Sequence, residues 1–238
     1  MRGLFVTGTD TNVGKSVLSA ALIAAMVAAG ERVVAHKPVV TGLGQTGKGS
    51  WPPDHELLAA MSGQRPHDVA PRRYEPAVSP QLAAQLNGEA IDRRDLLAAV
   101  PPAGRCLLVV EGVGGLLAPF AEDFSVRDLA SRLGLPVVVA ARPGLGTINH
   151  TLLTLEAARA AELDVRAVVL TPWPKRAPEL HRSNRSAIAR AGAIPVEVLA
   201  RVRAPERELL AAAGEQLPWR AWVGSDTSAR TDGAPNAR

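Results

Sequence analysis

A glycine-flanked loop near the start of the chain carries the residue types that bind phosphate. Residues 8–16 read Gly-Thr-Asp-Thr-Asn-Val-Gly-Lys-Ser, after a short apolar run and before a segment of helical spacing. Glycines let backbone amides close around phosphate oxygens, and the N-terminus of the following helix adds its dipole. Lys15 is expected to reach the β- and γ-phosphates, and the Ser16 hydroxyl to ligate Mg²⁺. Five residues, rather than the usual four, separate the two glycines, but strand, loop and helix follow in the required order. The loop predicts a nucleoside-triphosphate site.

Further charged residues stand at the ends of apolar runs. Glu111 ends the run at residues 107–110, where a buried carboxylate without compensation is costly; a nearby cation explains it. Lys37 follows another such run. Taken alone it would be a solvated lysine, but the carboxyl end of a strand beside a phosphate loop is where open α/β sheets bind ligands. Asp54 precedes a helical stretch and could be only an N-cap.

Uncharged residues add candidates with two interpretations each. Thr11 and Thr41 could donate hydroxyl hydrogen bonds to a ligand or be plain turn residues. The glycines of residues 112–115 permit close backbone approach to a ligand, or form a tight turn. Residues 144–149 open a helix whose free amides form an anion site, which is compatible with simple capping. His36 and His150 have no partner at ligand spacing and are expected to be structural.

These residues must be positioned by alternating strands and helices. Apolar runs at residues 4–7, 32–36, 107–111, 136–141, 167–171 and 194–198 are typical of buried parallel strands. Helical spacing covers residues 15–29, 126–133, 147–161 and 182–191, with Gly30, Gly134 and Gly192 as stop signals. The alternation predicts an α/β fold with a doubly wound, mostly parallel sheet flanked by helices, of the P-loop NTPase type.

One region does not follow this alternation of strands and helices. Residues 42–102 are rich in Gly and Pro with short helical stretches, and a long excursion at this edge of a sheet is typical of a functional loop or lid. Residues 1–224 are expected to form a single domain. Residues 225–238 are small, polar and charged, which predicts a disordered tail.

Composition narrows the class of function. The chain has 238 residues, a formal net charge of +4 and 47% hydrophobic residues. Its arginines are dispersed, which disfavours nucleic-acid binding, and the apolar run after the phosphate loop is too short to span a membrane. The single cysteine, Cys106, excludes an internal disulfide. With no visible signal peptide, the expected compartment is the cytoplasm.

Several segments together resemble the dethiobiotin synthetases of biotin biosynthesis. They are residues 8–16, His-Lys-Pro-Val at 36–39 with Thr-Gly at 41–42, Glu-Gly-Val-Gly-Gly-Leu at 111–116, and Gly-Leu-Gly-Thr-Ile-Asn-His-Thr at 144–151. The resemblance covers nearly the whole chain, in order.

The resemblance implies a reaction. One amine of 7,8-diaminononanoate takes up CO₂ to give a carbamate, and the γ-phosphoryl group of the nucleotide passes to the carbamate. The second amine then attacks the resulting carbamic–phosphoric anhydride and closes the ureido ring with loss of phosphate. Members of the family act as homodimers with Mg²⁺ and a nucleotide, and the substrate carboxylate is bound across the dimer interface.

The resemblance also implies residue roles. By this resemblance, the catalytic residues are Lys37, Lys15 and Thr11. The nucleotide-binding residues are Thr9, Asn12, Val13, Gly14, Lys15, Ser16, Val17, Glu111, Thr171 and Pro172. Substrate binding falls to Thr41, Lys37, Gly112, Gly115, Leu145, Gly146, Thr147, Ile148 and Asn149, and metal binding to Ser16, Asp54 and Glu111.

Two departures concern the nucleotide. Many relatives carry an Asn that reads adenine after the strand at residues 167–171, whereas this chain has Thr171-Pro172-Trp173-Pro174. Asn12 stands where other members carry an acid. ATP is the default nucleotide, and another triphosphate is the alternative.

Two other classes compete. A ParA/MinD-like ATPase switch shares the sheet, but such proteins carry an additional lysine near the start of the loop, where this chain has Thr9-Asp10. A synthetase related to the cobyrinate amidases would need a glutaminase domain that this chain is too short to hold.

Overall fold

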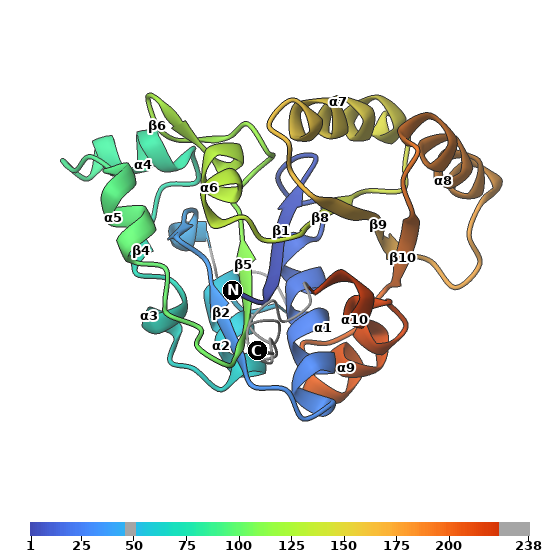
Figure 1. Ribbon diagram of the computed structural model, residues 1–238, viewed down its shortest axis with the longest axis horizontal. Helices are drawn as coiled ribbons and strands as arrows, with labels where there is room; N and C mark the ends of the chain where they lie inside the picture. Colours follow the sequence, from blue (N-terminus) through green and yellow to red (C-terminus); the bar gives the residue numbers. More distant parts are fainter. Residues whose placement is uncertain (46–50, 224–238) are drawn as a thin grey trace, which may run out of the picture.

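The computed structural model describes residues 1–45 and 51–223 and is built around a twisted six-stranded sheet (Figure 1). The strand order is β10-β9-β8-β1-β5-β2, and every neighbouring pair is parallel. The strands are β1 (Gly3–Gly8), β2 (Val33–His36), β5 (Leu107–Glu111), β8 (Val137–Ala141), β9 (Val165–Trp173) and β10 (Val196–Ala200). The predicted doubly wound parallel α/β fold is confirmed.

Helices cover both faces of the sheet (Figure 1). One face packs against α1 (Lys15–Ala28), α2 (Asp54–Ser62), α3 (Pro66–Val69), α9 (Arg207–Glu215) and α10 (Trp219–Trp222). The other face packs against α4 (Pro80–Leu86), α5 (Arg93–Ala98), α6 (Val126–Leu133), α7 (Thr147–Arg159) and α8 (Glu179–Gly192). Each sheet face therefore has its own apolar core.

Alternation along the central strand supplies both cores. Leu4 and Val6 point toward the α1 face, and Phe5 points toward the α6 face. All three side chains are fully buried. Because both faces are covered, the strand is continuously apolar, which is the pattern expected of a buried parallel strand.

The excursion contains more regular structure than its sequence indicates. Besides α2 to α5, it holds η1 (Leu43–Gln45) and β4 (Arg72–Arg73), which pairs in parallel with β3 (Val39–Val40) just before the excursion. An antiparallel pair, β6 (Pro119–Ala121) and β7 (Phe124–Ser125), precedes α6. One stop signal is corrected: Gly192 is the last residue of α8, and Ala193 takes the left-handed cap with φ 44°. The predicted tail lies outside the described residues.

The outer strand β2 is covered by a side chain. The Gln64 amide accepts from the backbone N of Ala35 at 2.7 Å and donates to the backbone O of the same residue at 3.2 Å. Just beyond β2, the backbone N of Lys37 donates to the Val69 carbonyl at 2.8 Å. These bonds hold the segment after Ser62 against the strand that leads to Lys37.

Helix α1 is almost entirely buried, and α9 packs directly on it. A Cβ on Gly214 would lie 2.1 Å from the carbonyl oxygen of Ala21. Gly214→Ala is therefore expected to force the two helices apart and lower the free energy of unfolding by about 2 kcal/mol or more. Denaturant unfolding would measure the change. Glu208→Ala, on an exposed position of the same helix, is the control and should stay within about 0.5 kcal/mol; equal effects would contradict close α1–α9 packing.

No helix among residues 1–45 and 51–223 is long and apolar enough to cross a membrane.

Candidate nucleotide and carboxylate-activation site

The phosphate loop lies between β1 and α1 and takes its shape from two left-handed residues. Asn12 has φ 54° and Gly14 has φ 91°. A Cβ on Gly14 would lie 2.8 Å from Cγ2 of Thr171, so both the backbone angle and the close neighbour require glycine. The Asp10 carboxylate accepts from the Thr11 backbone N at 2.7 Å, and the Asp10 carbonyl accepts from Lys15 Nζ at 2.8 Å. The loop is thus ordered by its own polar groups.

A buried charge cluster stands beside this loop. Lys37 Nζ forms ion pairs with Glu111 Oε1 and, at 2.9 Å, with Asp54 Oδ2. Ser16 Oγ donates to the same Glu111 oxygen at 2.7 Å. The sheet explains the meeting, because β2 and β5 are parallel neighbours with His36 opposite Val110. The residues that follow them, Lys37 and Glu111, therefore reach the carboxyl edge side by side.

Opposite charges favour the ionised forms of Lys37 and Asp54. Burial alone lowers the pKa of Lys37, but Asp54 and Glu111 outweigh it and raise that pKa above its ordinary value. Burial would likewise raise the pKa of Asp54, and the Lys37 ammonium holds it below the ordinary value. The Lys37 and Glu111 side chains are 3% and 0% exposed, so removing one partner would strand a buried charge.

Lys15 differs from Lys37. Burial, together with the charge of Lys37, lowers the pKa of Lys15 to about 8. Its only hydrogen bond among the described residues goes to a carbonyl rather than to a carboxylate. An incoming phosphate would supply the missing negative charge.

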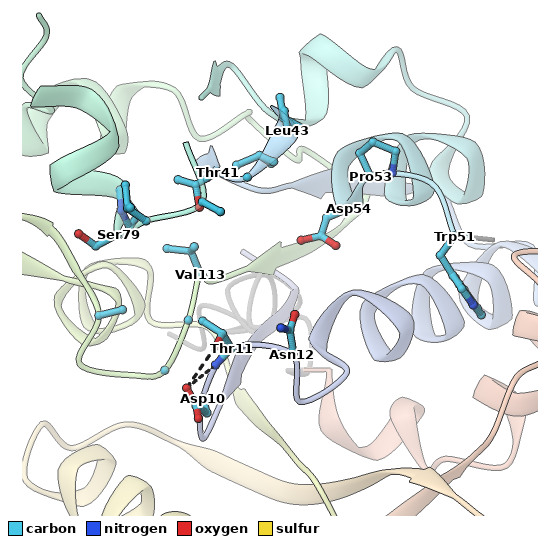
Figure 2. A pocket seen from close by; sticks show the side chains of 18 of the residues that line it. Asp10, Thr11, Asn12, Thr41, Leu43, Trp51, Pro53, Asp54, Ser79 and Val113 are labelled. Carbon is cyan, nitrogen blue, oxygen red and sulfur yellow. Dashed lines mark hydrogen bonds between the residues drawn. The ribbon is translucent and has the colours of Figure 1, made fainter. Parts of the chain in front are cut away.

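A large cavity opens above the loop and is lined by both polar and apolar side chains (Figure 2). Its volume is about 840 Å³. Thr11 and Asn12 lie across the open space from Thr41 and Asp54. Apolar lining is supplied by Val40, Leu43, Ala77, Val78, Val113 and Ala118. The cavity suits a ligand that carries both polar groups and an aliphatic chain.

A smaller pocket continues from the cavity to the phosphate loop. It has a volume of about 260 Å³ and shares Thr11, Asn12, Thr41 and Asp54 with the large cavity. Its other lining residues include Gly14, Lys15, Ser16, Val17 and Lys37. A phosphate held by the loop and a ligand in the large cavity would therefore meet near Lys37.

The oxygen atoms at this junction fit a magnesium ion. Glu111 Oε2 is buried and has no hydrogen-bond partner among the described residues. Lys15 and Lys37 balance Asp54 and Glu111, so a triphosphate adds uncompensated negative charge that a divalent cation would neutralise. The described residues contain no cluster of three His, Cys, Asp or Glu side chains that could hold a metal. Mg²⁺ needs few protein ligands, because it retains water and phosphate oxygens.

Most of the predicted site residues lie around the phosphate loop and the cavities beside it, and some do not. Gly115 lines the large cavity, and Thr9 lines an adjacent one of about 340 Å³. Val13 is buried beneath the loop, and Thr171 packs on Gly14. Gly112 faces Val126 instead, where a Cβ would lie 2.7 Å from Cγ1. Pro172 is exposed and lines neither the large cavity nor the loop pocket.

The predicted anion site at α7 lies apart from the cavity in this single chain. Leu145, Gly146, Thr147, Ile148 and Asn149 line neither the large cavity nor the loop pocket. Leu145 is 92% exposed, whereas Thr147 is buried with its Oγ1 3.5 Å from that of Thr151. The chain alone does not bring this segment to Lys37.

Some residues that line the large cavity were not predicted from the sequence. Ser79 and Pro80 begin α4, and Trp51, Pro52 and Pro53 precede α2. Only the location of the excursion, after a strand end, indicated that it would line a site. Asp10 and Gly114 were part of recognised motifs without a separate role.

The two histidines remain without a chemical role. His36 is fully buried, and neither ring nitrogen has a partner among the described residues. Burial lowers the pKa of His36 to about 4, so the ring is neutral near pH 7. His150 lines the 340 Å³ cavity next to α7.

The pKa of Lys15 leads to a pH dependence of nucleotide binding. Phosphate binds the ammonium form, so triphosphate affinity should fall above pH 8 by up to about tenfold per pH unit, with proton uptake on binding. Calorimetry from pH 7 to 9.5, in buffers of different ionisation enthalpy, would measure both. Lys15→Arg should flatten the profile, because arginine stays charged. A flat wild-type profile would contradict this assignment.

The fold and the loop define a P-loop nucleoside-triphosphate-binding α/β protein. A family model described as "AAA domain" matches residues 2–212. An ATP-dependent dethiobiotin synthetase BioD of Anaeromyxobacter sp. (strain Fw109-5) is 41% identical over 208 residues, covering 85% of this chain and 92% of that protein. The protein of the same name from Bacillus subtilis (strain 168) is 33% identical over 201 residues, covering 82% and 85%. The chain belongs to the dethiobiotin synthetase family.

A solved ParA family ATPase from Chlorobium tepidum TLS is also similar. It is 14% identical, covers 90% of this chain and 91% of that chain, and has a TM-score of 0.48. This similarity is too low to indicate a shared activity.

Proposed function

We propose that the protein is an ATP-dependent ligase that forms dethiobiotin from 7,8-diaminononanoate and CO₂ in biotin biosynthesis. The observation that carries the proposal is that the loop pocket, which Lys37 lines, shares Thr11, Thr41 and Asp54 with the large cavity. One cavity suits phosphate, and the other suits an aliphatic molecule that also carries polar groups. The relatives that carry the name of this activity match nearly the full length of the chain.

In the proposed reaction, one substrate amine first takes up CO₂ to give a carbamate. Lys37 stabilises the negative charge of the carbamate and of the phosphoryl group in transfer, and Lys15 holds the β- and γ-phosphates. Thr11 and Thr41 donate hydrogen bonds from the two sides of the small pocket. A carbamate oxygen attacks the γ-phosphorus and ADP leaves, giving the carbamic–phosphoric anhydride. The second amine attacks its carbonyl carbon, and phosphate and a proton leave as the ring closes.

The metal would be held by the oxygens of Ser16, Asp54 and Glu111. Bound Mg²⁺ neutralises phosphate charge during transfer. The unpartnered Oε2 of Glu111 supports this assignment, because a buried oxygen without a hydrogen bond costs free energy unless a ligand satisfies it.

The nucleotide is bound mainly through its phosphates in this proposal. Asn12, Val13, Gly14 and Val17 contribute backbone groups around the phosphates, and Thr9 supports the start of the loop. Thr171 and Pro172 stand where relatives read the base. Because neither offers an amide side chain, ATP is the default and other triphosphates are the alternative.

A homodimer would complete the substrate site. Leu117, Leu145 and Leu153 are 58%, 92% and 56% exposed, and Leu117 and Leu153 line the same 340 Å³ cavity. Exposed leucines beside an apolar cavity support burial against a second copy. In that arrangement the backbone amides of residues 145–149 bind the substrate carboxylate of the partner, with Gly112 and Gly115 shaping the cavity wall.

The decisive experiment combines two readouts. Purified protein is incubated with diaminononanoate, bicarbonate, Mg²⁺ and each nucleoside triphosphate in turn, and dethiobiotin and phosphate are measured together. Dethiobiotin equal to phosphate, and dependent on every component, would support the ligase, and the ranking of nucleotides would settle base preference. Phosphate release without dethiobiotin under every nucleotide would favour the ATPase switch instead.

A further inference from the structure

The three residues whose oxygens are assigned to Mg²⁺ are linked, directly or through Glu111, to the ammonium group of Lys37. Lys37 Nζ contacts Glu111 Oε1 and Asp54 Oδ2, and Ser16 Oγ donates to that same Glu111 oxygen. Asp54 and Glu111 come from separate elements, α2 and β5. Among the described residues, Lys37 is the only cation within ion-pair distance of either carboxylate.

A second cation cannot share these oxygens at low cost. A divalent ion on Glu111 Oε1 and Asp54 Oδ2 would lie close to the Lys37 ammonium, and the two like charges would repel. Water can screen them only from the Asp54 side, because the Asp54 side chain is 45% exposed whereas those of Lys37 and Glu111 are 3% and 0% exposed. An ion on the unpartnered Oε2 would lie on the same Glu111 carboxylate as the ammonium. Metal binding at either oxygen therefore favours exchange of Lys37 for the divalent ion.

The pocket offers the ammonium another position. Lys37 lines the 260 Å³ pocket together with Thr11, Thr41 and Val113. Its long side chain can turn into that space while its backbone stays fixed by the bond to Val69. This is the space where the proposed carbamate and γ-phosphate meet.

We propose that Lys37 is also a positioning residue for the metal site. Its ammonium group occupies the position of Mg²⁺ between Asp54 and Glu111 until the metal binds. Lys37 keeps the two carboxylates and Ser16 converged in the metal-free protein. On exchange, its ammonium turns toward the substrate. The inference rests on the proposed function for the identity of the metal and for what Lys37 meets after it moves.

Exchange has a consequence for catalysis. Lys37 faces the substrate only when the carboxylates hold the metal, so the two positive charges that the transfer requires arrive together. A nucleotide bound without metal would leave Lys37 on the carboxylates and the carbamate without its cation.

The test is metal affinity, measured with Mn²⁺ by electron paramagnetic resonance in the absence of nucleotide and substrate. Lys37→Met keeps the length of the side chain and removes the competing charge, so Mn²⁺ should bind at least ~10-fold more tightly than to the wild type. Lys15→Met removes an equal charge from the same pocket without freeing either carboxylate. It should change affinity by less than ~3-fold. Equal effects of the two variants, or no gain in Lys37→Met, would overturn the proposal.

A second measurement does not depend on the variants folding. A crystal structure of the wild-type protein with Mg²⁺ should place Lys37 Nζ out of hydrogen-bond distance of Glu111, on the Thr11 and Thr41 side of the pocket. Metal and ammonium both in contact with Glu111 would overturn the proposal. Neither measurement requires turnover, so failure of the exchange is distinguishable from failure of the ligase reaction, which is read from dethiobiotin alone.

Discussion

Lys37→Ala is expected to lower kcat for dethiobiotin formation by about 10³-fold or more, while the nucleotide Kd changes by less than about 3-fold. Phosphoryl transfer depends on positioned positive charge, and Lys37 is a buried cation that lines the loop pocket and pairs with Asp54, which lines both cavities. Nucleotide binding survives because the loop and Lys15 remain. Steady-state turnover and equilibrium binding of a fluorescent nucleotide would measure the two quantities.

Lys175→Ala provides the matched control for Lys37→Ala. Lys175 is exposed in the loop after β9 and has no ion pair or hydrogen bond to another described residue. Its removal changes net charge by the same amount and should leave kcat within about twofold. If Lys37→Ala retained turnover near the wild-type value with an intact fold, the catalytic assignment of Lys37 would be wrong.

Lys15→Ala is expected to weaken nucleotide binding about 100-fold. The Lys15 ammonium is largely buried within the loop, and charge-assisted hydrogen bonds to phosphate oxygens are among the strongest polar contacts. Isothermal titration with ATP and Mg²⁺ would give the affinity, and Lys175→Ala again controls for net charge. Unchanged affinity would mean that the triphosphate binds elsewhere.

Together the two lysine variants separate binding from chemistry. Lys15→Ala should raise the Kd for nucleotide, whereas Lys37→Ala should lower kcat with that Kd nearly unchanged. The structure favours this division because Lys15 belongs to the loop itself, while Lys37 reaches the same pocket from the end of β2, two strands away from β1.

The phosphate site was predictable because its residues are consecutive. Gly14, Lys15 and Ser16 lie in one motif between a strand and a helix, and local geometry alone determines where their groups point. A weaker rule, that ligands bind at the carboxyl ends of parallel strands, made Lys37 a site candidate, and Glu111 was expected to have a nearby cation, but the two were not paired with each other. The sequence did not contain the register that makes their strands direct neighbours.

The ion pair between Lys37 and Asp54 could not be predicted from the sequence. Asp54 belongs to a short helix in the excursion, and its position depends on how α2 packs on α1. By sequence alone it was as compatible with helix capping as with metal binding. It is the first helical residue, and Pro53 occupies the cap position, so capping is not its role.

Helices α5 and α9 were not predicted from the sequence, for a related reason. Each is short, and only part of each faces the core: Leu96 is the buried residue of α5, and Leu210 and Gly214 are those of α9. Their stability comes from tertiary packing more than from local pattern. The apolar wall of the large cavity was missed in the same way, because Val40, Val78 and Ala118 come together only after the excursion folds back.

The amide of Gln64 has a consequence for the behaviour of the protein in concentrated solution. By bonding to both backbone groups of Ala35, it occupies hydrogen-bonding positions on the outer strand that another chain would need to add itself to the sheet. Open strand edges are templates for intermolecular β-pairing and aggregation. The strand leading to Lys37 is therefore shielded from self-association by one side chain rather than by an additional strand.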